Sequence, residues 1–78
     1  MQHLYGQHAE RITEALRNAP GNTLCAYDLG QAVGIDSAVF YPVAHRMEAE
    51  GVLSSAWDET VKPRRRVYTL RIQEIPYG

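Results

Sequence analysis

Apolar residues recur at steps of three and four between Gln2 and Ala19, the pattern of a helix with one buried stripe. The stripe consists of Tyr5, Ala9, Ile12, Leu16 and Ala19. A Pro-Gly-Asn sequence follows at 20–22, and these residue types end helices and form turns. The pattern predicts an amphipathic first helix followed by a tight turn.

Two more helices are predicted on either side of Gly34. Residues 26–33 place Leu29 and Val33 on one face, and residues 35–51 (IDSAVFYPVAHRMEAEG) form a longer segment with a single apolar side. That apolar side consists of Phe40, Val43, Ala44 and Met47. A short helix, a turn with glycine and a longer helix make a helix-turn-helix arrangement, with Ile35 entering the core at the corner.

The longer helix has a second side that faces away from the core. It carries Ala38, Tyr41, Pro42, His45 and Ala49, with Arg46 at the border. Asp36 or Ser37 can cap the helix start, and Gly51 can end it. Pro42 has no N–H for the carbonyl of residue 38, so we expect a bend or a loosened first turn there. Such an outward-facing helix start suits contact with a partner.

Three segments have the patterns of strands. Residues 23–25 are a candidate for a brief strand, and residues 52–58 and 66–72 alternate between apolar and polar positions. The alternation places Leu53, Ser55 and Trp57 on one face of the first of these two strands, and Tyr68, Leu70 and Ile72 on one face of the second. The polar residues 58–65 then form the long loop of a hairpin. The prediction is an α+β fold in the order α-β-α-α-β-β, with Trp57 and Tyr68 in the core.

Length and cysteine content narrow the class of protein. A chain of 78 residues forms one domain, residues 1–78, with a thin core. Its single cysteine, Cys25, cannot form an internal disulfide, and no apolar run is long enough to cross a membrane. We expect a cytoplasmic protein in which Cys25 is a small buried apolar residue.

Charge is divided unevenly along the chain. The formal net charge is −1, but residues 1–61 carry three cations and eight anions, whereas residues 62–78 carry five cations and one anion. Surface potential decays over roughly 8 to 10 Å at physiological salt, so a local basic strip matters more than the total. The strip consists of Lys62, Arg64, Arg65 and Arg66, which suits contact with a polyanion.

No pattern of catalytic or metal-binding residues is present. His3 and His8 are five residues apart and do not share a helix face, and no second cysteine or carboxylate cluster accompanies them. Phosphate-binding glycine loops, paired catalytic carboxylates and nucleophile elbows are absent. We therefore expect neither an enzyme nor a metal or cofactor site, and the sequence leaves the existence of a small-molecule effector open.

Several segments resemble the PadR family of bacterial transcriptional regulators, which have a winged helix-turn-helix fold. The segments are Tyr27-Asp28-Leu29, Phe40-Tyr41-Pro42, residues 46–53 (RMEAEGVL), Trp57 and residues 62–70 (KPRRRVYTL). The resemblance spans roughly residues 12–70. It implies that the third helix enters the DNA major groove while the hairpin, as the wing, touches the flanking backbone or minor groove.

Carried over by position, the resemblance implies that Ser37, Ala38 and Tyr41 lie closest to bases, with Tyr27, Arg64 and Arg65 near phosphates. The residue types agree, because small or hydrogen-bonding side chains near a helix start suit the major groove. The full set expected to bind DNA is Tyr27, Ser37, Ala38, Tyr41, His45, Arg46, Lys62, Arg64, Arg65 and Arg66.

Alternatives remain open for several of these residues. Tyr41 can cover the edge of the domain, His45 can be a solvated helix residue, and Arg66 can pair with an acid. The whole arginine run can be a solvated hairpin tip. At the level of function, the rivals to a DNA-binding repressor are a winged helix that docks on a protein and a small architectural or recombination-directing factor that bends DNA.

Few phosphate contacts per chain indicate that a homodimer binds a palindromic site. The chain stops without the C-terminal helices through which PadR-family members dimerise. We therefore expect the dimer interface to use the apolar residues left outside the predicted core. These are Leu4, Tyr5, Ile72, Ile75 and Tyr77.

Overall fold

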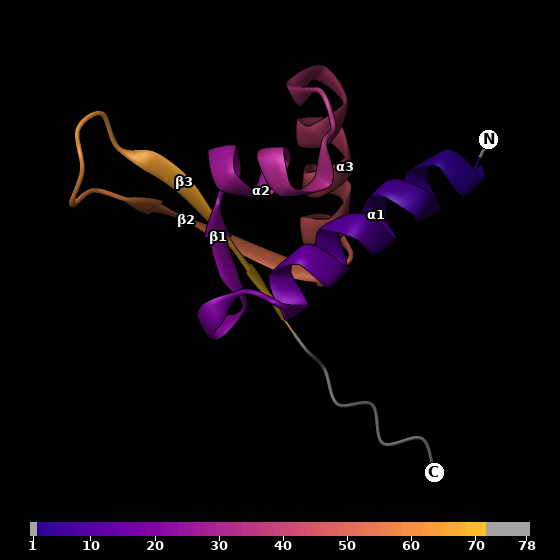
Figure 1. Cartoon of the computed structure of the whole chain (residues 1–78), viewed down its shortest axis with the longest axis horizontal. Coiled ribbons are helices and arrows are strands. Elements are labelled where there is room, and N and C mark those ends of the chain that lie inside the picture. Colours follow the sequence, from indigo (N-terminus) through magenta and orange to yellow (C-terminus); the bar gives the residue numbers. More distant parts are fainter. Residues whose placement is uncertain (1, 72–78) are drawn as a thin grey trace, which may run out of the picture.

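The helices and strands follow one another along the chain in the predicted order. The computed structural model describes residues 2–71, with side chains from Tyr5 onward. The elements are α1 (Gln2–Arg17), β1 (Thr23–Cys25), α2 (Ala26–Val33), α3 (Ser37–Ala49), β2 (Leu53–Asp58) and β3 (Arg65–Leu70), as Figure 1 shows. A 3₁₀ turn at Pro20–Asn22 joins α1 to β1. The predicted α+β class and α-β-α-α-β-β order are confirmed, and they are those of a winged helix-turn-helix.

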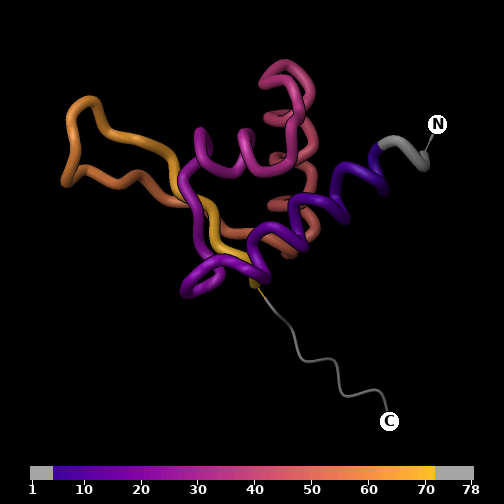
Figure 2. The backbone as a smooth tube through the Cα atoms, viewed as in Figure 1, coloured from indigo at the N-terminus to yellow at the C-terminus, as the bar shows by residue number. Residues whose placement is uncertain are grey.

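The three strands form one antiparallel sheet with β3 in the middle. β1 pairs with β3 only from residue 67 to residue 69, with Leu24 opposite Tyr68. β2 pairs along the whole of β3, from Leu53 opposite Leu70 to Asp58 opposite Arg65. The brief first strand is therefore confirmed. Beyond it the sheet has only two strands, and β2, β3 and their loop (residues 59–64), together called the wing, extend past the helices (Figures 1 and 2).

The core lies between the helices and the broad end of the sheet. All three helices contribute their predicted apolar faces, and the sheet contributes the inward side of β2 and β3. The buried cluster consists of Ile12, Leu16, Leu29, Val33, Phe40, Val43, Ala44, Met47, Leu53, Tyr68 and Leu70. Ile35 packs against this cluster at the corner between α2 and α3, as expected. Cys25 is also buried and is a free thiol.

The start of α3 is well defined. The Asp36 carboxylate accepts a hydrogen bond from the N–H of Ala38, which identifies Asp36 as the N-cap. The expected loosening of the first turn is not observed, because the N–H groups of Val39 and Phe40 both reach the Asp36 carbonyl at 2.9 and 2.8 Å. The helix continues through Pro42 without a break. Pro42 lies on the exposed side, where water can satisfy the carbonyl that lacks its N–H partner.

Glycine ends α3 and directs the chain into β2. Gly51 has a φ of 82°, in the left-handed region that favours glycine. Its N–H reaches the Glu48 carbonyl, and the N–H of Val52 reaches the Met47 carbonyl at 2.9 Å. This pair of bonds is a Schellman motif. It fixes the angle between α3 and the wing.

Trp57 was predicted to lie in the core but is exposed. It lies on the predicted face of β2, but 45% of it is exposed, whereas Leu53 on the same face is 2% exposed and Tyr68 is 3% exposed. The helices cover the sheet around Leu53 and Tyr68 and stop short of Trp57. Strand alternation identified its face correctly but could not show how far the wing extends beyond the core.

No helix in the described part of the chain combines the length and apolar character needed to span a bilayer.

The packing of α3 predicts a large loss of stability when Phe40 is truncated. Phe40 is 2% exposed and packs edge to face against Tyr68, with ring centroids 5.7 Å apart. Phe40→Ala should lower the free energy of unfolding by about 3–5 kcal/mol in urea denaturation followed by circular dichroism. Val39→Ala, at the neighbouring exposed position, should change it by less than about 0.5 kcal/mol. Equal losses in both variants would contradict this account of the core.

Candidate nucleic-acid interface

A single groove lies between the wing and the helices, and we call it the wing groove. α2, α3, β2 and β3 all contribute to its lining, and its volume is about 880 Å³. Its lining residues are Cys25, Ala26, Tyr27, Asp28, Tyr41, Pro42, His45, Glu48, Trp57, Arg64, Arg65, Arg66 and Tyr68. The groove therefore brings together residues of the third helix and the wing that are distant in the sequence.

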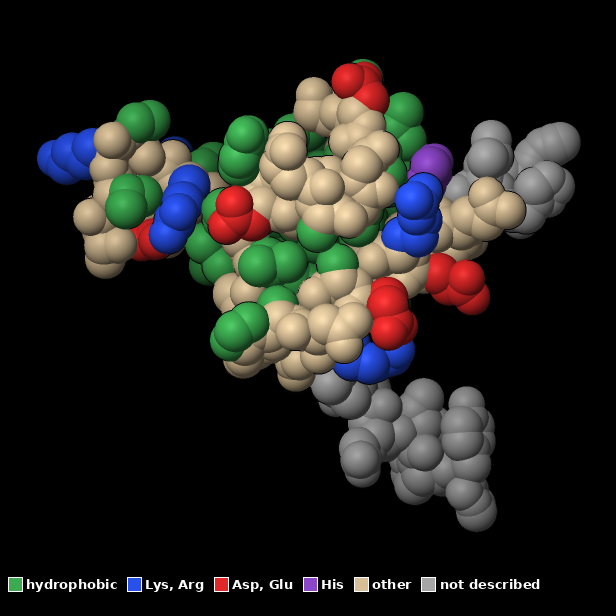
Figure 3. Space-filling view, viewed as in Figure 1, with side chains coloured by type: hydrophobic (Ala, Val, Ile, Leu, Met, Phe, Trp, Pro, Cys, Tyr) green, Lys and Arg blue, Asp and Glu red, His purple; other side chains and the backbone are tan. Residues whose placement is uncertain are grey.

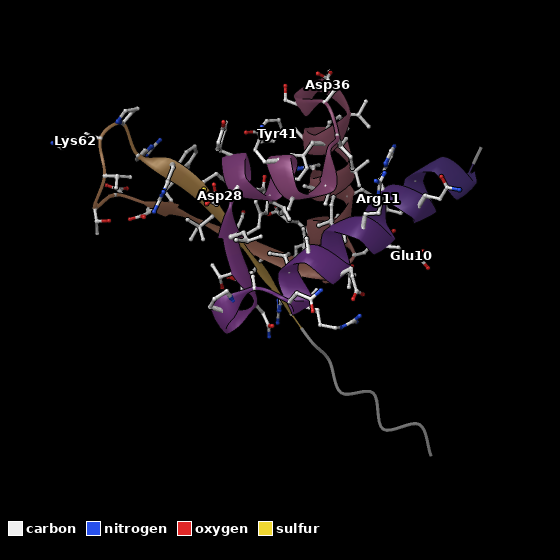
Figure 4. The ribbon with its side chains drawn as sticks, viewed as in Figure 1. Glu10, Arg11, Asp28, Asp36, Tyr41 and Lys62 are labelled. Atoms are coloured by element: carbon white, nitrogen blue, oxygen red, sulfur yellow. The ribbon has the colours of Figure 1, made fainter. Side chains whose placement is uncertain are left out.

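On the helix side, the groove is lined by the face of α3 that does not pack into the core. Tyr41 is 49% exposed, and its ring meets that of buried Phe40 edge to face, with centroids 5.2 Å apart. This contact holds the Tyr41 ring in place while leaving its other side open. His45 is exposed one turn further along the helix. Figure 4 shows Tyr41 between α2 and the start of α3.

On the wing side, the groove is lined by the inward face of the hairpin, in the part that extends beyond the core. Trp57 lies directly opposite Arg66 in the strand register. The guanidinium of Arg64 lies 4.2 Å from the centre of the Trp57 ring, and that of Arg66 lies 5.0 Å from it. Both distances are typical of cation–π contacts. The exposed indole is therefore a surface on which two arginines rest.

A polar network joins α3 to the wing at the inner end of the groove. Ser55 donates a hydrogen bond of 2.8 Å to the Glu48 carboxylate and accepts one of 2.7 Å from Arg66, whose guanidinium lies 3.9 Å from Glu48. Arg66 was expected either to contact a partner or to pair with an acid, and the structure shows it paired with an acid. Burial raises the pKa of the Tyr68 phenol beside this network, and the negative charge of Glu48 adds to the shift.

The other wing arginines pair with acids on the same hairpin. Arg64 lies 3.6 Å from Glu59, and Arg65 lies 3.2 Å from Asp58. Exposed pairs of this kind add little to stability, so a stronger anion can replace the carboxylate. Lys62 has no ion pair with any described residue and stands at the tip of the wing (Figure 4). Figure 3 shows Lys and Arg side chains at this end of the molecule.

The residues at the start of α3 lie beside the wing groove. Ser37, Tyr41 and Tyr27 line an adjoining hollow at the corner between α2 and α3. Tyr27 is 73% exposed and lines both depressions. Ala38 is exposed on the same helix without lining either one. The structure thus brings together most residues of the expected DNA-binding set.

Arg46 is placed differently from the rest of that set. Its guanidinium lies 3.9 Å from the centre of the Tyr5 ring and donates a 3.2 Å hydrogen bond to Glu50. Tyr5 belongs to α1 and donates its own hydrogen bond to Glu50 at 2.9 Å. Arg46 is therefore turned toward α1, away from the wing groove.

Most of the residues expected at the dimer interface lie outside the part of the chain that the structure describes. Ile72, Ile75 and Tyr77 lie outside the described residues, and so does the side chain of Leu4. Tyr5 is half-buried and packs against the core of its own domain, so part of its surface is already used.

Sequence reasoning missed the contribution of Trp57, Asp28 and Glu48 to this surface. The sequence analysis places Trp57 in the core and assigns neither acid to the site. A signal was available for Trp57, because the long polar loop after it implies a hairpin that outgrows a thin core. No comparable signal in the sequence indicated that acids of two helices would line the same groove as the wing.

Comparisons of the chain with protein-family models, curated proteins and solved structures find no match. Among the described residues, no group of three or more His, Cys, Asp or Glu side chains is placed to hold a metal ion. The site is therefore defined by its geometry and its side chains alone.

Hydrogen bonds in the turn of the wing lower the pKa of Asp58. The hydroxyl and the N–H of Thr60 both donate to the Asp58 carboxylate, and these bonds lower its pKa below 3.8 more than the pair with Arg65 does. Their stabilising effect is present above the ordinary Asp pKa and disappears as the pH falls through the lowered value. Thr60→Val should raise the Asp58 pKa in a ¹³C NMR titration. Arg65→Gln should raise it less, and the reverse order would refute this explanation.

Proposed function

We propose that this domain binds double-stranded DNA, with α3 in the major groove and the wing on the flanking backbone. The observation that carries the proposal is that exposed Tyr41 and His45 of α3 line the same groove as Arg64 and Arg65 of the wing. One duplex can meet both only if they share a surface. The major groove, about 12 Å wide, admits a helix, and a neighbouring hairpin then falls near the phosphates.

The start of α3 has side chains suited to reading bases. Ser37 can donate to or accept from a base edge, and Ala38 can meet a thymine methyl group. Tyr41 combines a fixed ring with a phenol that can donate a hydrogen bond. Their exposure on one helix side supports this role.

The wing supplies the charge for backbone contact. Lys62, Arg64 and Arg65 are exposed at its outer end, while Arg66 is occupied by Glu48 and Ser55. Three phosphate contacts give a slope of about −3 in log K against log salt for one protomer. Such modest affinity favours a homodimer on a palindromic site, as two protomers double the contacts.

In this proposal the protein acts as a PadR-like repressor in the cytoplasm, where it occupies a promoter and performs no catalysis. The PadR resemblance and the shared surface of α3 and the wing support that role. The dimer interface is proposed to involve Leu4, Tyr5 and the residues from Ile72 to Tyr77. A bending factor would use the same surface but would show less dependence on Tyr41.

A second candidate, docking on a protein partner, is favoured by one observation. Arg64 and Arg65 are each paired with an acid, so the wing is less basic than its run of arginines suggests. Arginine and aromatic residues are also frequent at the centres of protein interfaces. Counterion release distinguishes the two candidates, because only a nucleic-acid complex follows the phosphate count.

Removing one wing arginine should change the salt dependence by one phosphate. For Arg64→Ala, the slope of log K against log salt should become shallower by about 0.9, with affinity reduced to a similar extent on every duplex sequence. The measurement is fluorescence anisotropy of a labelled duplex at several salt concentrations. Arg17→Ala is the matched control, because Arg17 pairs with Glu14 on α1 far from the groove. An unchanged slope for Arg64→Ala would remove the wing from the interface.

Selection of bound sequences from a random duplex pool should enrich a palindrome with the intact chain. Tyr41→Ala should still bind DNA but should lose the preference at the enriched positions, each of which is worth about 1–3 kcal/mol. Val39→Ala, at an exposed position of α3 outside the wing groove, is the control and should keep the enriched motif. Recovery of the same motif by Tyr41→Ala would show that Tyr41 reads no base, and the lack of any motif would favour the bending factor.

A further inference from the structure

We propose that the wing groove also binds unpaired nucleobases of a single-stranded nucleic acid, stacked against its exposed aromatic rings. This activity is additional to duplex binding and does not require it. The starting point is the distribution of exposed apolar side chains over the described surface. The large ones are Tyr27, Val39, Tyr41 and Trp57, and only Val39 lies outside the wing groove.

The three aromatic residues come from three different elements. Tyr27 belongs to α2, Tyr41 to α3 and Trp57 to β2, and they are 73%, 49% and 45% exposed. The core does not need these surfaces, because its own cluster is complete without them. Proteins that bind single strands stack successive bases on such rings.

The charges are arranged in the way that a nucleotide requires. Arg64 and Arg65 have side chains more than half exposed and can reach a phosphate. Asp28 and Glu48 also line the groove, where a carboxylate repels phosphate but accepts hydrogen bonds from the amino group of a base such as cytosine. Cations for the backbone and acids plus rings for the base match a nucleotide better than they match a plain polyanion.

The size of the groove agrees with this occupant. Sites for small organic ligands usually have volumes of about 300–1,000 Å³, and the wing groove has about 880 Å³. Its open side allows a strand to enter and leave. Arg64 already rests on Trp57 at 4.2 Å, so a base can take the place of that guanidinium while Arg64 moves to a phosphate.

Trp57 provides a direct test, because it is the only tryptophan in the chain and its fluorescence reports on the groove. Titration of the whole chain with a short oligo-dC should quench this fluorescence. An abasic oligomer of the same length keeps the phosphates without the bases and should bind at least about tenfold more weakly. Equal binding of the abasic oligomer, or equal quenching by polyglutamate, would overturn the proposal.

Variants locate the contact. Trp57→Ala should weaken oligo-dC binding by about 5- to 100-fold in anisotropy of a labelled oligomer, the range for loss of one stacked base, whereas Trp57→Phe should retain most of it. Tyr27→Ala should also weaken binding, and as the most exposed ring it can be removed without unfolding the domain. Val39→Ala, outside the groove, should have no effect. Unchanged affinity in both the Trp57→Ala and Tyr27→Ala variants would refute the assignment.

A duplex of the same length separates this inference from the proposed function. Oligo-dC binding without duplex binding would leave the inference standing and overturn the proposed function. Duplex binding without oligo-dC binding would do the reverse. Binding of neither nucleic acid in anisotropy of labelled oligomers would refute both and would leave protein docking as the role of the groove.

Discussion

The packing of one side of α3 against the sheet and the other helices decides how the rest of the molecule is arranged. Phe40, Val43, Ala44 and Met47 are all less than 10% exposed, and together they hold the helix in one rotational setting. A rotation of α3 about its axis would carry these side chains toward solvent and turn polar residues toward the core. Because this face of α3 is buried, the opposite face is exposed to solvent, and Tyr41 is held in an exposed position.

The second constraint is the mismatch between the length of the wing and the extent of the core. A domain of this size can bury only a limited part of a hairpin. The broad end of the sheet carries Leu53, Tyr68 and Leu70 under the helices, while Trp57 and Arg66 continue the same inward face beyond them. The face that would be core in a larger domain therefore becomes the wall of an open groove.

Electrostatics on this surface are local and balanced. Glu59, Asp58 and Glu48 each lie beside one of the three consecutive arginines, at 3.6, 3.2 and 3.9 Å. These acids orient the guanidinium groups in the free protein and compete with any incoming anion. An anion that binds the wing must therefore displace these carboxylates or share the arginines with them.

Sequence patterns alone determined the helices and strands, their order and the two faces of α3. Periodicities of 3.6 and 2 residues show which side chains can be buried together. The sequence patterns also singled out Tyr41 and the arginine run as exposed residues that could meet a partner. They could not show that Trp57 lies outside the core, that Arg66 is held by Glu48 and Ser55, or that Arg46 turns toward Tyr5. They also predicted a looser first turn of α3 than the structure has. Each of these outcomes depends on distances between segments far apart in the chain, and only the packing of the helices on the sheet sets those distances.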